Sequence, residues 1–282
     1  MIGDQVAALL GAKVAGVTAL GTGSGGTGAY RVALLSGENV FAKAYPGPQP
    51  GFLAAEANGL RWLREAEGAP VPEVLGELED LLVTAWINPG RPTASGADEF
   101  GRSLATVHAR GAQSFGAPWP GYIGALPMDN TESDDWAGFY AERRVLPYLR
   151  AAVDRGAVDV GQAADIERVC ARIEDLAGPP ELPARLHGDL WAGNVHWDVR
   201  GRAWLIDPAA HGGHRETDLA MMALLEPPRL ETILSAYDEV HPLADDWRDR
   251  VALHQLHPLL VHAAMFGGSY GEQAVGAARQ YL

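Results

Sequence analysis

The sequence predicts an α+β fold with two lobes, a small antiparallel-sheet lobe over residues 1–88 and a larger, mostly helical lobe over residues 89–282. In the first lobe, short apolar runs alternate with turn residues, a pattern typical of antiparallel strands. A segment dense in proline and glycine, Asn88-Pro89-Gly90-Arg91-Pro92, then indicates a linker. Beyond it, apolar residues recur at helical spacing. Because ligands commonly bind in the cleft between two such units, we expect the functional site there.

The small lobe is expected to begin with an amphipathic helix, because Val6, Leu9 and Leu10 share one helical face. A glycine-rich segment at residues 21–28 lies between two strand-like runs, as the loop of a hairpin would. The stretch before the last strand carries two prolines and a glycine, so we expect it to break the preceding helix. The expected elements are helices at 1–12 and 52–67, and strands at 14–20, 29–35, 40–45 and 81–87.

The large lobe is expected to consist mainly of helices. Two short strands, at 195–197 and 203–206, flank the turn Asp198-Val199-Arg200-Gly201 and predict one small hairpin. The expected helices lie at 98–110, 134–155, 160–176, 217–225 and 230–239, and the chain from residue 244 is also mostly helical.

Composition and charge narrow the range of partners. Hydrophobic residues make up 47% of the 282 residues, as in ordinary globular proteins, and the formal net charge is -14. Such a charge repels nucleic acid and anionic membranes. No apolar run approaches the roughly 20 residues that span a bilayer, and the N-terminal segment lacks the basic leader of a secretion signal. We therefore expect a cytoplasmic protein that binds neither nucleic acid nor membrane. The sequence leaves the oligomeric state open, with a monomer favoured.

Cys170 is the only cysteine, so no disulfide can form within the chain. It lies in a helical pattern that turns it toward the core. We therefore expect a buried, inert thiol rather than a nucleophile.

The strongest signal is the stretch Arg185-Leu186-His187-Gly188-Asp189-Leu190-Trp191-Ala192-Gly193-Asn194. Four residues separate Asp189 from Asn194, and Asp207 ends an apolar run thirteen residues after Asn194. Phosphoryl transfer from ATP needs an Asp that orients the attacking hydroxyl, and an Asn and an Asp that hold Mg²⁺ against the phosphates. The protein-kinase catalytic loop has the same spacing but carries Arg where this chain has Gly188. The pattern therefore indicates a kinase of small molecules.

Upstream residues supply the second half of an ATP site. The pattern G-x-G-x-x-G occurs twice, and Gly23, Gly25 and Gly26 are expected to cover the ATP phosphates from a hairpin loop. Lys43 ends the segment Val40-Phe41-Ala42-Lys43, which is similar to the lysine strand of kinases. Glu56, on the following helix, is the expected ion-pair partner of Lys43. Taken singly, these residues could equally be a plain hairpin loop and two solvated charges.

Histidines near the acids leave a second chemistry open. Together with Asp189 and Asp207, they could ligate zinc or iron in a metallohydrolase. No His-x-x-x-His pair or Glu-x-x-His spacing occurs among them, so this hypothesis ranks well behind the kinase. The histidines concerned are His187, which we expect to anchor the loop, His196, His211 and His214.

The motif from His187 to Asn194 resembles the His-Gly-Asp-Leu-Trp-x-Gly-Asn signature of the fructosamine kinase (ketosamine-3-kinase) family. The wider aminoglycoside phosphotransferase and choline kinase group shares the His-Gly-Asp and the Asn but usually lacks the Trp. The resemblance covers essentially the whole chain and implies a protein-kinase-like fold. Other similar segments are 101–108, 122–124, 135–140 with Arg143, 206–209 and 213–221.

The family resemblance implies an ATP-dependent kinase that acts on a sugar hydroxyl, the 3-hydroxyl, of ketosamines such as fructosamine or ribulosamine. The acceptor would be a small ketosamine or a glycated amine, including a protein lysine, and the activity would reverse glycation. The residues that the resemblance implicates are Asp189 as catalytic base, Asn194 and Asp207 as magnesium ligands, Lys43 as the ATP lysine, Asp218 as the acid that braces the catalytic loop, and Ala85 and Ile87 as the hinge that holds adenine.

The acceptor side is defined less sharply. Trp191 could present its flat face to a sugar or to a cationic amine, which would gain about 0.5–2 kcal/mol over the ring, although a core position is the commoner fate of a Trp. His211 and Glu216 are the other candidates for substrate contact. His211-Gly212 and Met128 depart from the family pattern on this expected substrate side. Two alternatives therefore stay open, an aminoglycoside- or choline-type phosphotransferase and a nucleotide-binding pseudokinase.

Overall fold

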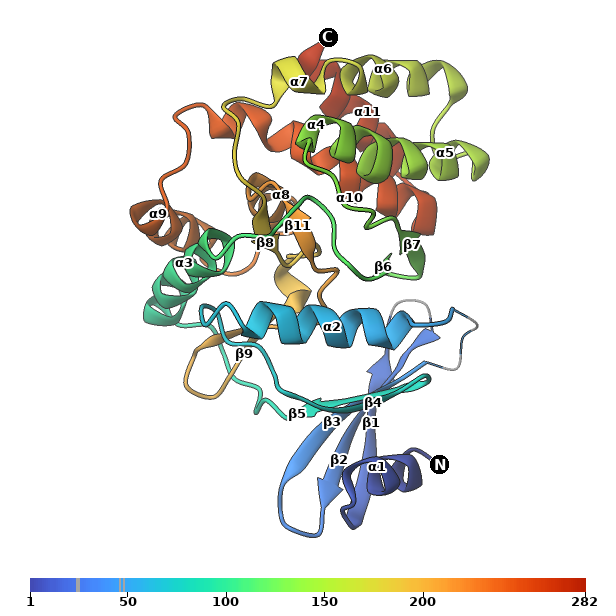
Figure 1. The fold of residues 1–282 in the computed structure, drawn as a ribbon, viewed down its shortest axis with the longest axis vertical. Helices are drawn as coiled ribbons and strands as arrows, with labels where there is room; N and C mark the ends of the chain where they lie inside the picture. Colours follow the sequence, from blue (N-terminus) through green and yellow to red (C-terminus); the bar gives the residue numbers. More distant parts are fainter. Residues whose placement is uncertain (24–25, 46, 48) are drawn as a thin grey trace.

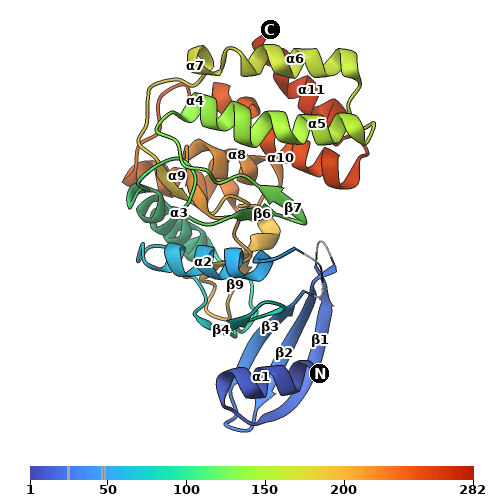
Figure 2. The same ribbon diagram turned by 45° about the vertical axis from the view of Figure 1, so that its right-hand side comes forward.

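The structure is a computed structural model that describes residues 1–23, 26–45, 47 and 49–282. A small sheet lobe and a larger helical lobe are stacked along the long axis of the molecule, with the chain termini in different lobes (Figure 1). Helix α2 (Phe52–Arg64) lies between the sheet and the helical lobe in both views (Figures 1 and 2). The two-lobed α+β architecture predicted from the sequence is confirmed.

The sheet of the small lobe has five antiparallel strands in the order β1-β2-β3-β5-β4. The strands are β1 (Val14–Thr22), β2 (Gly28–Leu34), β3 (Asn39–Ala44), β4 (Val74–Leu78) and β5 (Leu81–Ala85). Thr22 pairs with Gly28, which makes the glycine-rich segment the loop of the β1–β2 hairpin. Strand β4 is not predicted from the sequence, because Gly76 resembles a breaker. As an edge strand, β4 accommodates Gly76 at a shift in its register with β5.

Two helices pack against this sheet. Helix α1 (Ile2–Leu10) buries Val6 in a small cluster with sheet residues such as Val32 and Val83. Its Leu9 lies over Gly76, where an added Cβ would stand only 2.8 Å from Leu9 Cγ. Helix α2 ends three residues earlier than predicted, because the chain turns there and Glu67 takes a positive φ of 55°.

The helical lobe begins with α3, whose start at Ala94 precedes the predicted residue 98. The reason is a cap, since the Thr93 side chain accepts a hydrogen bond from the Gly96 amide at 3.0 Å. The helices of this lobe are α3 (Ala94–Ala109), α4 (Trp136–Phe139), α5 (Leu146–Asp154), α6 (Val160–Cys170), α7 (Ile173–Leu176), α8 (Glu216–Leu224), α9 (Leu230–Val240), α10 (Val251–Phe266) and α11 (Tyr270–Ala278). The predicted helix at 160–176 is therefore two helices, α6 and α7.

Two prolines distort helices of the large lobe. The predicted helix at 134–155 contains a π-helical turn at Tyr140–Val145, directly before Pro147, which has no N–H for the regular ladder. Pro258 lies inside α10 and leaves the carbonyl of His254 without its helical donor. The Tyr140 hydroxyl, from the π-helical turn, donates to that carbonyl at 3.0 Å and replaces the donor that Pro258 lacks.

Short strand pairs complete the lobe, and only one of them is predicted from the sequence. The predicted hairpin is β9 (Val195–Trp197) with β10 (Ala203–Leu205). The other pairs are β6 (Gly121–Ile123) with β7 (Leu126–Met128), and β8 (Ala184–Leu186) with β11 (His211–Gly213). Strands of three residues are too short to show a periodic pattern.

The largest hydrophobic cluster crosses from one lobe to the other. Leu53 and Leu60 of α2 belong to the same cluster as Phe100 of α3, Leu205 of β10 and Ile233 of α9. A second cluster fills the space among α5, α6, α10 and α11. Helix α2 is thus anchored on the helical lobe by buried side chains. In the part of the chain that the structure describes, no helix is long and apolar enough to cross a membrane.

Candidate active site

The segment that follows β8 forms a tight loop, and its backbone requires a glycine. Gly188 has a φ of +83°, and a Cβ at this position would stand 2.1 Å from the carbonyl oxygen of Ala209. An Arg at this position, as protein kinases have, would not fit. Gly188 thus brings the loop up against the segment after Asp207.

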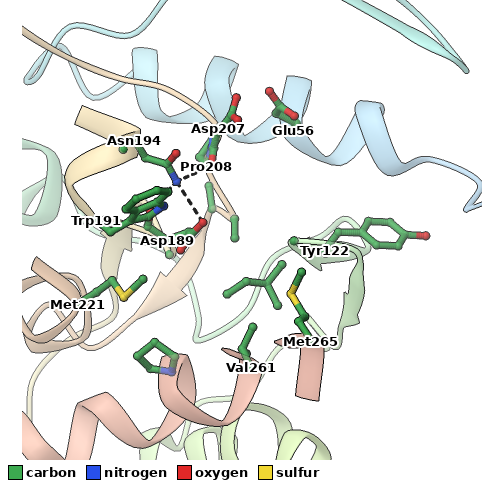
Figure 3. Close-up of a pocket in the computed structure, with 18 of the residues that line it drawn as sticks. Glu56, Tyr122, Asp189, Trp191, Asn194, Asp207, Pro208, Met221, Val261 and Met265 are labelled. Carbon is green, nitrogen blue, oxygen red and sulfur yellow. Dashed lines mark hydrogen bonds between the residues drawn. The ribbon is translucent and has the colours of Figure 1, made fainter. Parts of the chain in front are cut away.

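Three side chains expected to act on phosphate groups converge at this loop. Asn194 Nδ2 donates to the Asp189 carboxylate at 3.0 Å and to the Asp189 carbonyl at 2.8 Å (Figure 3). It also lies 3.5 Å from the carbonyl of Asp207. Asp207 takes a positive φ of +52°, a strained conformation for a residue with a side chain. These contacts join the two halves of the predicted motif into one cluster.

The base of the loop is held by Asp218 on α8. Its carboxylate accepts hydrogen bonds from the backbone amides of His187 (2.7 Å) and Gly188 (2.9 Å), and from His108 Nε2 (3.2 Å). Burial opposes the charge on Asp218, but the His108 contact and the backbone amides outweigh it and lower its pKa. An ionised, buried acid therefore fixes the loop from behind.

His187 completes this support as a neutral side chain. Its Nδ1 accepts from the Asp189 amide at 3.2 Å, so Nε2 carries the proton and donates to the Ile206 carbonyl at 2.9 Å. Burial lowers the pKa of His187, which keeps it neutral. The histidine links the segment of Asp189 to that of Asp207.

Lys43 lies on β3 and faces two carboxylates. Its Nζ is 2.7 Å from Glu56 on α2 and 3.2 Å from Asp207. Burial acts against the charge of Lys43, but Glu56 and Asp207 outweigh it and raise its pKa. Burial raises the pKa of Glu56, and Lys43 offsets this only in part. The structure thus brings Lys43 and Glu56 together and places both beside the Asp207 segment.

Asp189 is poised to exchange a proton near neutral pH. Burial is the largest cause and raises its pKa to about 7, although the hydrogen bond from Asn194 acts in the opposite direction. The charges of Asp207 and Asp218 add to the increase. A carboxylate with such a pKa can act as a general base at physiological pH.

Two adjoining hollows lie between the lobes. The larger has a volume of about 660 Å³ and is lined by Lys43, Asp189, Asn194 and Asp207 among others. The smaller, about 130 Å³, is mainly apolar and is lined by Ala85, Ile87 and Ile206 among others. The volumes suit a small molecule in the first and a flat ring in the second.

The glycine loop and the hinge border these hollows. Gly23 lines the larger one, and its amide donates to the Thr27 carbonyl at 2.7 Å. Gly26 has a positive φ of 84°, whereas the predicted Gly25 lies outside the described residues. At the hinge, the amide of Ala85 already donates to the Glu73 carbonyl at 2.8 Å.

Trp191 lines the cavity beside Asp189. The structure places it in the lining of the larger cavity, with 38% of its surface exposed, beside Met221 of α8 (Figure 3). Its ring covers Gly193, where an added Cβ would approach the ring to 2.4 Å. Trp191 is therefore not a core side chain.

The structure does not bring His211 or Glu216 into the cavity, and the expectation of substrate contact needs correction for both. His211 is buried between the Ala209 carbonyl, 2.9 Å from its Nδ1, and Arg144, 3.3 Å from its Nε2. Burial keeps the pKa of His211 well below its usual value. Glu216 is buried in a two-point ion pair with Arg250, at 2.7 and 2.9 Å. Met128, the other departure on this side, lies in the hydrophobic core.

The histidines do not assemble around the acids as a metallohydrolase would require. Among the described residues, the one metal-like cluster is His214, Glu216 and His254, which is buried away from Asp189 and Asp207. The guanidinium of Arg250 already occupies the carboxylate of this cluster. A metal ion bound there would add positive charge beside this guanidinium, and the cluster has no second carboxylate to neutralise it.

Sequence reasoning missed several residues of the site. His108 supports Asp218, although it lies 110 positions away in sequence and has no motif spacing to it. Helix α10 and strand β6 contribute much of the cavity wall, including Val261, Met265 and Tyr122. Apolar wall residues look like core residues in a sequence, so no signal could have singled them out.

Solved structures share this architecture. The chain superposes on a candidate fructosamine-3-kinase from Thermobifida fusca with a TM-score of 0.93, at 49% identity and with 99% of this chain and 97% of that chain covered. The choline kinase LicA of Streptococcus pneumoniae gives a TM-score of 0.64 at 16% identity, covering 99% of this chain and 98% of that one. That second likeness concerns the fold alone. The protein is a phosphotransferase of the protein-kinase-like class.

Sequence comparison then gives the family. The model of the fructosamine kinase family matches residues 5–282, and the chain belongs to this family. A probable ketoamine kinase of Enterococcus faecium is 35% identical over 236 residues, which are 83% of this chain and 84% of that protein. The chloroplastic protein-ribulosamine 3-kinase of Arabidopsis thaliana is 32% identical over 253 residues, 86% of this chain and 76% of that one. The resemblance found in the sequence motifs is confirmed.

Proposed function

We propose that the protein transfers the γ-phosphoryl group of ATP to a sugar hydroxyl, the 3-hydroxyl, of a ketosamine such as fructosamine or ribulosamine. The observation that carries the proposal is Asp189, whose pKa of about 7 suits a base and which faces a cavity large enough for a sugar adduct. Family membership supports the ketosamine class, and the name of the plant relative supports carbon 3. Trp191, beside Asp189, offers the sugar a flat face.

Transfer would proceed in line. Asp189 takes the proton of the substrate hydroxyl as its oxygen attacks the γ-phosphorus, while the bond to the bridging β,γ-oxygen breaks and ADP leaves. Lys43, held by Glu56 at 2.7 Å, is placed to neutralise the nucleotide phosphates. Ala85 and Ile87 would hold adenine through their backbone, Ala85 by its carbonyl because its amide already donates to Glu73. Most of the acceleration would come from positioning and charge.

Asn194 and Asp207 fit a magnesium ion. Asn194 Nδ2 is committed to Asp189, which leaves the amide oxygen free to bind a metal. The Asp207 side chain is 45% exposed at the same place. Carboxylate and amide oxygens are the hard ligands that Mg²⁺ prefers. When bound, the ion would neutralise charge on the phosphates.

The proposal has a biochemical consequence. Once carbon 3 carries a phosphate, enolisation of the carbonyl toward carbon 1 allows the phosphate to be eliminated. Hydrolysis then releases the amine. The activity would therefore remove sugar from glycated amines.

An ATP-consumption screen tests the function. The acceptors are fructosamines, ribulosamines and erythrulosamines, compared with aminoglycosides and choline, and phosphorus NMR of the product locates the phosphate. We expect ketosamines to be the preferred acceptors and carbon 3 to carry the phosphate. Preference for choline or an aminoglycoside would replace the proposal with another phosphotransferase, and no ATP consumption on any acceptor would indicate a pseudokinase.

The rate should depend on pH through Asp189. A base works only when deprotonated, and burial raises the pKa of Asp189 to about 7, so kcat/KM for the ketosamine should rise as pH increases through that value. Below the pKa, the rate should fall about tenfold per pH unit. The measurement is kcat/KM at saturating Mg-ATP from pH 5.5 to 8.5. A flat profile over this range would show that Asp189 is not the titrating base.

A further inference from the structure

The larger cavity extends well beyond the catalytic groups. One end holds the charged side chains Lys43, Glu56, Asp189 and Asp207. The other end is formed by the last turns of α10, the start of α11 and the segment around β6. We call it the apolar end, and its residues are Trp119, Ile123, Val261, Met265, Phe266 and Tyr270.

The side chains of the apolar end form the cavity wall over the second hydrophobic cluster. Ile123 and Val261 are buried members of that cluster, and Met265 and Tyr270 pack against it. Val261 and Met265 lie across the cavity from Trp191 and Asp189 (Figure 3). Phe266 is 56% exposed and lines the cavity, so its ring is accessible to a ligand bound there. Met265 reaches over Gly124, where an added Cβ would stand 2.5 Å from its Cε. Met is a flexible side chain that adapts to different apolar ligands.

Among the described residues that line the apolar end, none is a Lys, Arg, Asp or Glu. Among the described residues that line the cavity, Lys43 is the only Lys or Arg, and it is bound to Glu56. The carboxylates of the lining are all at the catalytic end. His257 is uncharged there, because burial and the nearby Arg144 lower its pKa to about 3. An anion bound here would lose its water without gaining a counter-charge.

The histidine at the rim also contributes an aromatic surface. His262 Nδ1 donates to the Pro258 carbonyl at 2.6 Å, which fixes its ring. The ring centroid lies 5.7 Å from that of Phe266 and 5.0 Å from that of Tyr270. The three rings form a continuous aromatic edge.

We propose, on the basis of the proposed function, that the apolar end binds the amine carrier of the ketosamine and selects apolar or aromatic carriers over carriers with a carboxylate. The sugar hydroxyl that is phosphorylated must lie at Asp189. The amine is attached two carbons away from carbon 3, so the carrier extends away from Asp189 into the rest of the cavity. The carrier is then the part of the substrate that meets Met265 and Phe266.

A carrier series with one sugar tests the selection in the unaltered enzyme. The acceptors are ketosamines of methylamine, n-butylamine, benzylamine and glycine. Burial of a phenyl group in an apolar site should raise kcat/KM for the benzylamine adduct about tenfold or more above that for the methylamine adduct. Because its carboxylate would be unpaired, the glycine adduct should have a kcat/KM about tenfold below that of the methylamine adduct. Equal values across the four carriers would overturn the inference.

Phe266 allows the selection to be altered by one side chain. Phe266→Ala should lower kcat/KM for the benzylamine adduct about fivefold to tenfold, with a loss that grows with carrier size. Phe266→Lys supplies the missing counter-charge, so kcat/KM should rise about fivefold for the glycine adduct and fall for the benzylamine adduct. A matched control is Leu182→Lys, which adds the same charge at a residue that is 89% exposed and does not line the cavity.

The controls separate the two proposals. Leu182→Lys should leave the order of kcat/KM among the carriers unchanged. If it shifts the order as Phe266→Lys does, the effect comes from net charge, and the proposal of a carrier subsite is refuted. If the unaltered enzyme phosphorylates the methylamine adduct but neither Phe266 variant changes the order, the carrier subsite is refuted and the proposed function stands. If no ketosamine is phosphorylated, both proposals fall.

Discussion

Asp189→Ala is expected to lower kcat about 10²- to 10⁴-fold, the usual contribution of a positioned general base. ATP binding should survive, because the loop does not depend on the lost carboxylate. The Asp189 carbonyl still accepts from Asn194 at 2.8 Å, and Asp218 still holds the amides of His187 and Gly188. Steady-state kinetics measure the loss. The rise in melting temperature on addition of Mg-ATP measures nucleotide binding.

Asp207→Ala is the matched control for this prediction. It removes an acid of the same cluster, but one that faces Lys43 at 3.2 Å and the proposed metal position. We expect it to weaken Mg-nucleotide binding, so that the thermal shift by Mg-ATP shrinks, whereas Asp189→Ala preserves the shift. If Asp189→Ala keeps turnover within about tenfold of the unaltered enzyme, Asp189 is not the base, because even a weak general base contributes more.

The sequence predicted the parts of the site that rest on local spacing. Asp189, Asn194 and Asp207 belong to one motif, and a motif records short-range geometry directly. To predict Lys43 and Glu56, it was enough to recognise a hairpin, a strand and a helix following one another in the chain. The two-lobed fold followed from the change of hydrophobic period at the linker.

The acceptor side could not be predicted in the same way. His211 and Glu216 are polar and lie close to Asp207 in sequence, which suggested substrate contact, but β11 and α8 turn both side chains into the interior. The residues that line this part of the cavity, such as Met265, are apolar and distant in the chain. A polar residue in a helix can face either solvent or a buried partner, and only the tertiary fold decides between them.

Helix α8 therefore combines two buried acids with different partners. Asp218 points to the catalytic loop, whereas Glu216 points to Arg250 near the start of α10. Because α10 forms part of the wall of the larger cavity, the Glu216–Arg250 pair joins the support of the Asp189 loop to that wall. A structural role for Glu216 and a substrate role make opposite predictions, which one variant can separate.

Glu216→Ala is expected to lower the free energy of unfolding by about 3 kcal/mol, because it leaves the buried guanidinium of Arg250 without its main partner. The two side chains are only 2% and 5% exposed, and two hydrogen bonds join them at 2.7 and 2.9 Å. Asp246, at 2.8 Å, retains part of the pairing and keeps the loss at the lower end of the range for buried pairs. Urea unfolding monitored by tryptophan fluorescence measures the change.

Asp246→Ala is the control, since it removes an acid from the same Arg250 at an exposed position and should cost less than about 1 kcal/mol. The pH dependence gives an independent check. Burial opposes the charge of Glu216, but His254 and Arg250 outweigh it and lower its pKa from 4.5 to about 2. A lowered pKa stabilises the fold above the unfolded value, so the advantage of the unaltered protein over Glu216→Ala should shrink as pH falls from about 4.5 toward 2. An altered KM for the ketosamine with unchanged stability would instead return Glu216 to the substrate site and contradict its place in the interior.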